Sequence, residues 1–305
     1  MVMSKAPLIS VVMTVYNSEA YLADAVAGIL SQSLADFEFI IVNDGSTDRS
    51  QEILRHFADR DRRIKLISRH NTGIVRAANE GISIATGKYL ARMDSDDVAL
   101  PERFATQVAY LESHPDCVLV GSRVMLMDPY GSPVAPSGHS TDPKEINAQL
   151  LTGDGGWAFC NPVTMMPLAA ARKVGLYREK CFVCEDHDMF LRLSEIGDIA
   201  NLPDILLWYR RHYKSINHTQ FERQFQLKKS IVADAFERRG QKMPENWSWR
   251  GWQPEPYDRQ LRLWGWAALK AGNIGIARKH AVNAWKESPM NAENWKLMFH
   301  AMLGS

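Results

Sequence analysis

The chain has 305 residues, of which 46% are hydrophobic and 23% are charged, and its formal net charge at pH 7 is +1. These values are typical of a soluble globular protein with one large domain or two smaller ones. The near-neutral charge gives no reason to expect nucleic-acid binding. No apolar run has the length of a signal peptide core or a membrane span, so we expect a cytoplasmic protein, with contact at the inner face of the membrane left open.

Strands and helices are predicted to alternate through the first third of the chain. Short apolar runs predict strands, and capping residues followed by helical periodicity predict the helices between them. The predicted strands cover residues 7–16, 37–42, 63–68 and 88–97, and the predicted helices cover residues 19–31, 48–57 and 72–85. Such alternation is typical of βαβ units with a mainly parallel sheet.

The strand predicted over residues 88–97 ends in Asp94, Asp96 and Asp97. Ligands bind at the carboxyl ends of strands in an open α/β sheet, and carboxylates crowded there repel one another unless a cation lies among them. An Asp-x-Asp at this position therefore favours Mg²⁺ or Mn²⁺ bound together with a phosphate. A solvated acidic turn that caps the next helix is the alternative.

The middle of the chain is less regular. Helices are predicted over residues 103–113, 168–174 and 185–196, and strands over residues 118–127 and 205–212. The stretch 128–143 is rich in Pro, Gly, Ser and Asp, and we predict it to be a loop of the length that often forms a lid or a binding loop.

Several motifs in this order resemble the family 2 inverting glycosyltransferases, which have the GT-A fold. The matching segments are residues 11–17, 41–48, 71–73, 79–81, 85–89, 91–97 and 185–186. No single segment is decisive, but together they span about residues 8–215. The resemblance implies an α/β fold: a GT-A type, Rossmann-like, mainly parallel sheet flanked by helices, followed by an all-helical C-terminal segment.

The resemblance also implies a division of the chain. Residues 1–217 would form the catalytic domain, with a nucleotide-sugar-binding half over residues 1–97 and an acceptor-binding half over residues 98–217. Residues 218–305 would form a helical C-terminal region.

By resemblance, residues of the first half contact the nucleotide-sugar donor. These residues are Thr14, Tyr16, Asn17, Asp44, Asn71, Arg76, Asp94 and Ser95, joined by His212 from a later basic motif. Asp44 is expected to accept the ring N–H of uracil or thymine, and an Asx-turn that closes its strand is the plainer interpretation. Tyr16 is expected either to stack on the base or simply to pack. His212 either closes over the diphosphate or is solvated.

One departure from the family pattern concerns the arginine of the third-helix motif. Many relatives carry arginine directly before Asn79, where this chain has Ala78, and Arg76 lies two residues earlier. A phosphate contact by Arg76 therefore departs from the family pattern.

The catalytic assignments also follow from the resemblance. Asp96 and Asp94 are expected to hold Mn²⁺ or Mg²⁺, which stabilises the charge that develops on the leaving diphosphate. Asp186 matches the general base that deprotonates the acceptor hydroxyl, and Glu185 beside it would orient the acceptor. A carboxylate in the first turn of a helix is also favoured by the helix dipole alone, and His187 is expected to pack and not to bind metal.

The C-terminal region allows more than one interpretation. The segment 221–239 is a basic amphipathic helix, which either binds anionic lipid or covers a core. Trp247, Trp249 and Trp252 either anchor the chain at a membrane interface or fasten a loop to the catalytic domain. The last segment resembles one tetratricopeptide-type hairpin, with a further helix over Ala292–Leu303. A lone repeat cannot bury both faces, so it is expected to dock on the catalytic domain, a second copy or another protein.

These observations favour a metal-dependent inverting glycosyltransferase that moves a sugar from a nucleoside-diphosphate sugar, with UDP-sugar as the favoured donor, to an acceptor hydroxyl. The resemblance suggests a saccharide or lipid-linked saccharide acceptor in bacterial cell-surface polysaccharide or lipopolysaccharide biosynthesis. The alternatives are a non-catalytic nucleotide-sugar-binding scaffold and a nucleotidyltransferase, although the latter should carry a Gly-rich triphosphate loop where Tyr16 and Asn17 stand.

Overall fold

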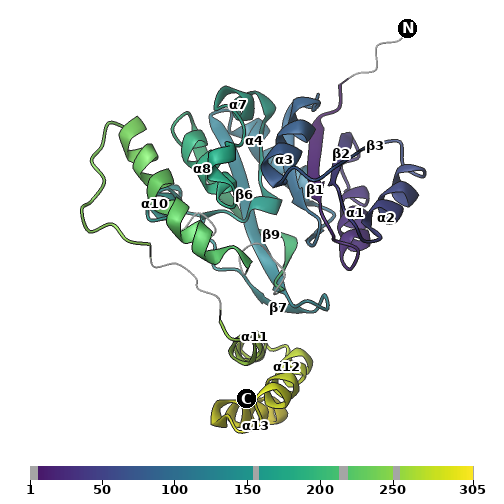
Figure 1. Cartoon of the computed structure of the whole chain (residues 1–305), viewed down its shortest axis with the longest axis vertical. Coiled ribbons are helices and arrows are strands. Elements are labelled where there is room, and N and C mark those ends of the chain that lie inside the picture. The colour runs from purple at the N-terminus through teal and green to yellow at the C-terminus, as the bar shows by residue number, and fades with distance from the viewer. Residues whose placement is uncertain (1–5, 154–157, 213–218, 250–254, 305) are drawn as a thin grey trace. The chain divides into compact units, whose positions relative to one another are not determined.

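The computed structural model describes residues 6–153, 158–212, 219–249 and 255–304 (Figure 1). The chain folds into two compact units. The first unit consists of Met1–Val124, Gly138–Leu207 and Glu222–Gly251, and the second consists of Met125–Ser137, Trp208–Phe221 and Trp252–Ser305.

A nine-stranded mixed sheet has the order β3-β2-β1-β4-β8-β6-β9-β5, with β7 paired to β6. The strands are β1 Ile9–Val15, β2 Phe37–Asp44, β3 Ile64–Arg69, β4 Tyr89–Asp94, β5 Val98–Ala99, β6 Cys117–Met127, β7 Pro133–Pro136, β8 Met165–Pro167 and β9 Asp198–Arg210. Strands β3, β2, β1 and β4 pair in parallel, whereas β8 is antiparallel to both β4 and β6. The α/β class predicted from the alternation is confirmed.

Helices follow the strands of the first unit much as the sequence predicts. They are α1 Leu22–Leu30, α2 Ser50–Ala58, α3 Ile74–Ser83, α4 Arg103–Ser113, α5 Pro143–Leu151, α7 Leu168–Lys173, α8 Glu185–Leu193 and α10 Phe221–Arg238, with 3-10 turns η1 Asn161–Val163 and η2 Glu179–Cys181. No helix in the described part of the chain is long and apolar enough to span a bilayer.

The central parallel strands are buried on both faces, which explains their nearly continuous apolar sequence. Every residue of β1 and β2 is buried. Val12, Ile40 and Val42 from these strands pack with Val75 and Ile82 of α3 in one core. Because β1, β2 and β4 run in parallel, their carboxyl ends meet at one edge of the sheet, where polar side chains can gather.

Helix α10 covers part of this core. Its residues Ile231, Val232 and Ala235 are buried there beside the α8 residues Met189 and Phe190. Of the two interpretations of this basic helix, the structure shows the core-covering one. Residues 222–251 accordingly belong to the first unit, so the division into compact units differs from the predicted boundary after residue 217.

Two tryptophans after α10 pack on the turn at Gly153. Trp247 donates its Nε1–H to the carbonyl oxygen of Leu151 (2.9 Å). A Cβ atom at Gly153 would lie 3.1 Å from Trp247 and 3.2 Å from Trp249, and the φ of this glycine is +87°. Trp247 and Trp249 therefore fasten their loop to the first unit, whereas Trp252 lies outside the described residues.

The stretch 128–143, predicted to be a loop, contains strand β7. It pairs antiparallel to β6, with Pro136 opposite Met125 and Pro133 opposite Met127. Two prolines argue against a strand, but proline is tolerated in an edge strand because its missing N–H can face away from the partner strand. The prediction of a loop was wrong for Pro133–Pro136, because the two prolines concealed an edge strand.

In its described residues, the second unit contains three helices, the β6–β7 turn with β7, and the end of β9. The helices are α11 Tyr257–Lys270, α12 Ile274–Glu287 and α13 Ala292–Leu303, the last with the predicted bounds. Leu261, Ala277 and Leu297, one from each helix, share a core with Val134 of β7. The close approach of α11 and α13 depends on Gly265, because a Cβ there would lie 2.5 Å from Leu297.

A buried carboxylate joins the β6–β7 turn to α12. The Asp128 side chain is fully buried, and its Oδ2 lies 2.7 Å from Nζ of Lys279 and 3.2 Å from Nε2 of the equally buried His280. Its Oδ1 accepts backbone N–H groups of Tyr130 and Ser132, both at 2.9 Å. Burial acts to raise the pKa of Asp128, but the close contacts with His280 and Lys279 outweigh it and hold the pKa well below its usual range.

We expect Asp128→Ala to destabilise the second unit by about 3 kcal/mol, because the substitution leaves buried His280 and two backbone donors without their acceptor. Thermal and urea unfolding would measure this loss, with Glu255→Ala as the control, since Glu255 pairs with an Arg259 side chain that is 58% exposed. The loss of stability in Glu255→Ala should be below about 1 kcal/mol. A loss in Asp128→Ala that is no larger would contradict the prediction. Because the folded-state pKa is depressed, this stabilisation is present at neutral pH and is lost only as the pH falls through the folded-state pKa.

Candidate active site

The loops after β1 and β2 are tied together by Asn17. Its Oδ1 accepts the backbone N–H of Thr47 (2.8 Å), and its own N–H is donated to Oγ of Ser46 (3.0 Å). Asn17 has a φ of 49°, in the left-handed region that asparagine tolerates better than most residues. Asn17, which was predicted to contact the nucleotide-sugar donor, therefore holds the two loops together at the sheet edge.

Thr14 and Tyr16 differ in exposure although they lie two residues apart. Thr14, at the end of β1, is buried and stands opposite Asp94 of β4 in the parallel register. Tyr16, just beyond β1, is 52% exposed. A ring with this much exposure does not pack in the core, so the structure favours the alternative in which Tyr16 stacks on the base.

Asp44 ends β2 and organises the segment before α3. Its carboxylate accepts backbone N–H groups of Thr72 (3.0 Å) and Gly73 (2.8 Å), and the Nε–H of Arg69 (3.0 Å). A carboxylate has about four acceptor positions, so Oδ2, which accepts from Gly73, keeps one for a ligand N–H. The Asx-type turn considered for Asp44 is made by the preceding residue, Asn43, whose Oδ1 accepts the N–H of Ser46 (3.1 Å).

Gly45 allows Asp44 and the Asn71 segment to approach closely. Its φ is +78°, and a Cβ atom there would lie 2.5 Å from the backbone nitrogen of Asn71. We expect Gly45→Ala to weaken nucleotide binding by about tenfold or more, because the side chain pushes Asn71 away from Asp44 and adds backbone strain. Titration with nucleoside diphosphates would measure the loss.

Gly240→Ala is the matched control for this prediction, because Gly240 also has a positive φ (+64°) but a Cβ there meets nothing within 4 Å. The control isolates backbone strain from steric contact. Equal nucleotide affinity in the two variants would contradict the role assigned to Gly45.

A pocket of about 530 Å³ opens next to this segment. It is lined by Asn71, Thr72, Gly73, Val75, Arg76, Glu179 and Phe182. Arg76 forms an ion pair with Glu179 (2.9 Å), and both side chains are more than half exposed. Such a surface pair is weak, so an anionic ligand in the pocket can compete with Glu179 for Arg76.

The acidic motif after β4 combines exposed and buried carboxylates. Asp94, Ser95 and Asp96 are partly exposed, whereas Asp97 is fully buried. Ser95 is tied to the loop after β1 by a 2.6 Å hydrogen bond between its Oγ and that of Ser18. Asp94 and Asp96 are thus presented at the sheet edge, and Asp97 is not.

Asp94 lies among charges of both signs. Its Oδ1 is 3.5 Å from the guanidinium of buried Arg92. Burial raises the pKa of Asp94 to about 6; the cation of Arg92 opposes this shift, and the negative charges of Asp96 and Asp186 add to it. The structure therefore brings Asp186 into electrostatic range of the Asp-x-Asp motif.

The chemistry of this donor set fits a divalent cation bound with a substrate. Within the described ranges, no three His, Cys, Asp or Glu side chains gather closely enough to hold a metal by themselves. Mg²⁺ and Mn²⁺ commonly bind through one or two carboxylates and complete their coordination with phosphate oxygens and water. Asp94 and Asp96 provide such a pair.

The second acidic motif opens helix α8. Asp186 is partly exposed, and its Oδ1 accepts the backbone N–H of His187 (2.7 Å). Glu185 is only 8% exposed. Burial raises the pKa of both carboxyls, and the charge of Asp186 adds to the shift of Glu185.

His187 packs in the interior and is not placed to bind metal. It is 3% exposed, and its Nε2 hydrogen-bonds the carbonyl oxygen of Leu150 (2.8 Å). Burial lowers the pKa of His187 to about 4, so it is neutral at pH 7.

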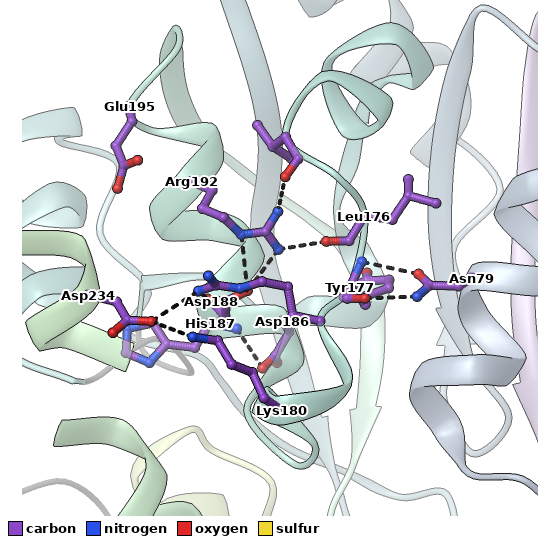
Figure 2. Close-up of polar contacts among 12 residues, drawn as sticks. Asn79, Leu176, Tyr177, Lys180, Asp186, His187, Asp188, Arg192, Glu195 and Asp234 are labelled. Atoms are coloured by element: carbon purple, nitrogen blue, oxygen red, sulfur yellow. Dashed lines mark hydrogen bonds and ion pairs between the residues drawn. The ribbon is translucent and has the colours of Figure 1, made fainter. Parts of the chain in front are cut away.

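An ion-pair network missed by the sequence predictions holds the first turn of α8 (Figure 2). Asp188 is fully buried and accepts from Nε of Arg178 (2.9 Å) and from Nε of Arg192 (3.0 Å). Arg192 also donates to the carbonyl oxygens of Leu176 (2.6 Å) and Val174. The i,i+4 spacing of Asp188 and Arg192 was the available sequence signal. The network fixes the helix that presents Asp186.

His212 follows the end of β9 in the second unit. Its predicted donor contact stays a prediction from the resemblance.

Known proteins resemble this chain in sequence and in fold. The profile described as Glycosyl transferase family 2 matches residues 10–165. An uncharacterized glycosyltransferase of Haemophilus influenzae is 31% identical over 244 residues, which cover 75% of each chain. Among solved structures, S. aureus TarS 1-349 in complex with UDP-GlcNAc has a TM-score of 0.57 and 16% identity, covering 96% of this chain and 79% of that one. The mannosyltransferase PcManGT from Pyrobaculum calidifontis, in complex with GDP-Man and Mn²⁺, has a TM-score of 0.55 and 14% identity, covering 98% and 81%. The GT-A architecture expected from the sequence agrees with these neighbours.

Proposed function

Because the chain belongs to glycosyl transferase family 2, and so is a glycosyltransferase, we propose that it acts by metal-dependent inversion on a nucleoside-diphosphate sugar. The observation that carries this proposal is the interaction of two acidic motifs: the charge of Asp186, at the start of α8, adds to the raised pKa of Asp94, at the end of β4. Family membership leaves the nucleotidyltransferase alternative without support.

Donor binding is assigned to the sheet edge. Oδ2 of the buried Asp44 has one acceptor position left for the ring N–H of a uracil base, and exposed Tyr16 can stack on that base. A UDP-sugar is the favoured donor, supported by the UDP-GlcNAc complex of TarS, while the GDP-Man complex of PcManGT keeps a GDP-sugar as the second choice. Arg76 and Asn71 line the neighbouring pocket and are assigned to the polar part of the donor.

Transfer is a single in-line displacement. Asp186 accepts the proton of the acceptor hydroxyl while that oxygen bonds to the anomeric carbon and the bond to the diphosphate breaks. A divalent cation, Mn²⁺ or Mg²⁺, bound by Asp96 and Asp94 would stabilise the leaving diphosphate. The raised pKa of Asp186 makes its carboxylate a stronger base than an exposed aspartate.

The acceptor is proposed only as a chemical class. We propose a saccharide or lipid-linked saccharide acceptor in bacterial surface polysaccharide or lipopolysaccharide biosynthesis, at the cytoplasmic face of the membrane. Helix α13 presents three exposed apolar side chains at helical spacing, Trp295, Phe299 and Met302, which are 53%, 63% and 52% exposed. They support a protein partner or a second copy for the tetratricopeptide-like C-terminal helices.

Turnover of a donor panel with anomeric analysis tests the proposal. Purified protein would be incubated with UDP-, dTDP-, GDP- and CMP-sugars, with Mn²⁺ or with a chelator, and the released or transferred sugar followed by proton NMR. We expect one donor to be consumed only with the metal, and the first sugar product to have the opposite anomeric configuration. Retained configuration, or turnover unaffected by the chelator, would contradict the mechanism.

A further inference from the structure

Several buried polar atoms near the two acidic motifs lack hydrogen-bond partners among the described residues. Three of them are Nε of Arg92, the hydroxyl of Tyr177 and Oε2 of Glu185. The three residues are 1%, 3% and 8% exposed. Because leaving buried polar groups unpaired costs free energy, three such groups in one neighbourhood indicate a network that is completed in another state of the enzyme.

The backbone of Tyr177 is held firmly. Asn79 of α3 donates its Nδ2–H to the carbonyl oxygen of Tyr177 (2.8 Å) and accepts the Tyr177 N–H on Oδ1 (3.1 Å), as Figure 2 shows. The guanidinium of Arg92 lies 5.7 Å from the centre of the Tyr177 ring, and the same guanidinium pairs with Asp94. The phenol is thus fixed next to the cation that neutralises part of the acidic site.

Both chain neighbours of Tyr177 are tied to α8, the helix that carries Glu185 and Asp186: Arg192 donates to the carbonyl oxygen of Leu176 (2.6 Å), and Arg178 donates to Asp188 (2.9 Å). Burial raises the pKa of Tyr177, with Arg92 acting in the opposite direction and the charges of Asp186, Glu185 and Asp94 adding to the rise. Its hydroxyl therefore stays protonated at neutral pH and can donate a hydrogen bond. Glu185, which is nearly inaccessible, is poorly placed to touch an acceptor sugar and better placed to meet another protein group.

We propose that Tyr177 is a positioning residue for sugar transfer: in the substrate-bound enzyme its hydroxyl donates a hydrogen bond to a carboxylate oxygen of the Glu185–Asp186 pair. This inference rests on the proposed function, because it gives Tyr177 a task only if Asp186 acts as the base. The hydrogen bond orients the base toward the acceptor hydroxyl, while Asn79 supplies the rigidity behind Tyr177.

Tyr177→Phe removes only the hydroxyl, and Tyr89→Phe is its matched control. Tyr89 is 2% exposed on β4, and its hydroxyl donates to Oε1 of Glu112 (2.8 Å). We expect Tyr177→Phe to lower kcat by about tenfold with the donor KM changed by less than about twofold, since a charge-assisted hydrogen bond is lost after binding. Its Tm should not fall, because the hydroxyl is unpaired in the free enzyme, whereas Tyr89→Phe should lower Tm and keep kcat.

The possible outcomes separate a failure of the inference about Tyr177 from a failure of the proposed function. If the wild type turns over a donor and Tyr177→Phe keeps its kcat, the inference is overturned and the proposed function stands. A lower kcat accompanied by a Tm loss greater than that of Tyr89→Phe would show a merely structural role and also overturn it. A wild type that consumed no donor would overturn the proposed function, and the inference with it.

Discussion

Asp186→Asn is expected to lower the transfer rate by about 10²–10⁴-fold while donor affinity changes by less than about twofold. The amide keeps the size of the side chain and can still accept the N–H of His187, which Asp186 accepts at 2.7 Å. It cannot take a proton from the acceptor hydroxyl at neutral pH. Transfer rates at saturating donor, together with a separate nucleotide titration, would separate catalysis from binding.

The matched control is Asp142→Asn. Asp142 caps helix α5 by accepting the N–H of Lys144 (2.9 Å) and is exposed. Asparagine is as good an N-cap as aspartate, so this variant should keep the wild-type rate. If Asp186→Asn also kept it, Asp186 would not be the base, and a non-catalytic nucleotide-sugar-binding scaffold would become the better account.

Asp96→Ala should reduce transfer by about 10²-fold or more and remove the effect of Mn²⁺ on nucleotide binding. Asp96 and Asp94 are the partly exposed carboxylates of the acidic motif at the end of β4, so the substitution removes one of the two proposed carboxylate ligands and weakens binding of the cation. Donor turnover at several Mn²⁺ concentrations would measure both effects.

Asp36→Ala serves as the control, because Asp36 is an exposed aspartate that precedes β2, at the opposite end of that strand from Asp44. It should match the wild type at every Mn²⁺ concentration. Unchanged metal dependence in Asp96→Ala would remove Asp96 from the metal site.

Much of the fold could be predicted because its signals are local. The uninterrupted apolar run of β1 and the Gly-containing turn after Asp44 mark a buried parallel strand and a sheet-edge loop in any context. The prolines of β7 hid an edge strand, because proline is ordinarily evidence against one. Strand β9 begins at Asp198, before the predicted residue 205, since Pro203 and Asp204 interrupt its apolar pattern.

The sequence offered candidate site residues but not the contacts that support them. Asp94 and Asp186 were assigned because the family pattern marks them, and their roles stay predictions. The paired hydrogen bonds between Asn79 and Tyr177 join residues 98 positions apart, and no periodicity in the sequence reports such a contact. The buried state of Glu185 was equally hidden, since a charged residue in a first helical turn is usually exposed.

Thermal unfolding of the wild-type protein with UDP, dTDP, GDP and CMP, each with and without Mn²⁺, tests the central claim most directly. A ligand at about 100 times its Kd stabilises the folded state by about 2.7 kcal/mol, which is readily seen as a rise in Tm. The account predicts selective, Mn²⁺-dependent stabilisation by one nucleotide, with UDP favoured. If no nucleotide raised the Tm under any metal condition, the assignment of the donor site to Asp44, Asp94 and Asp96 would be contradicted.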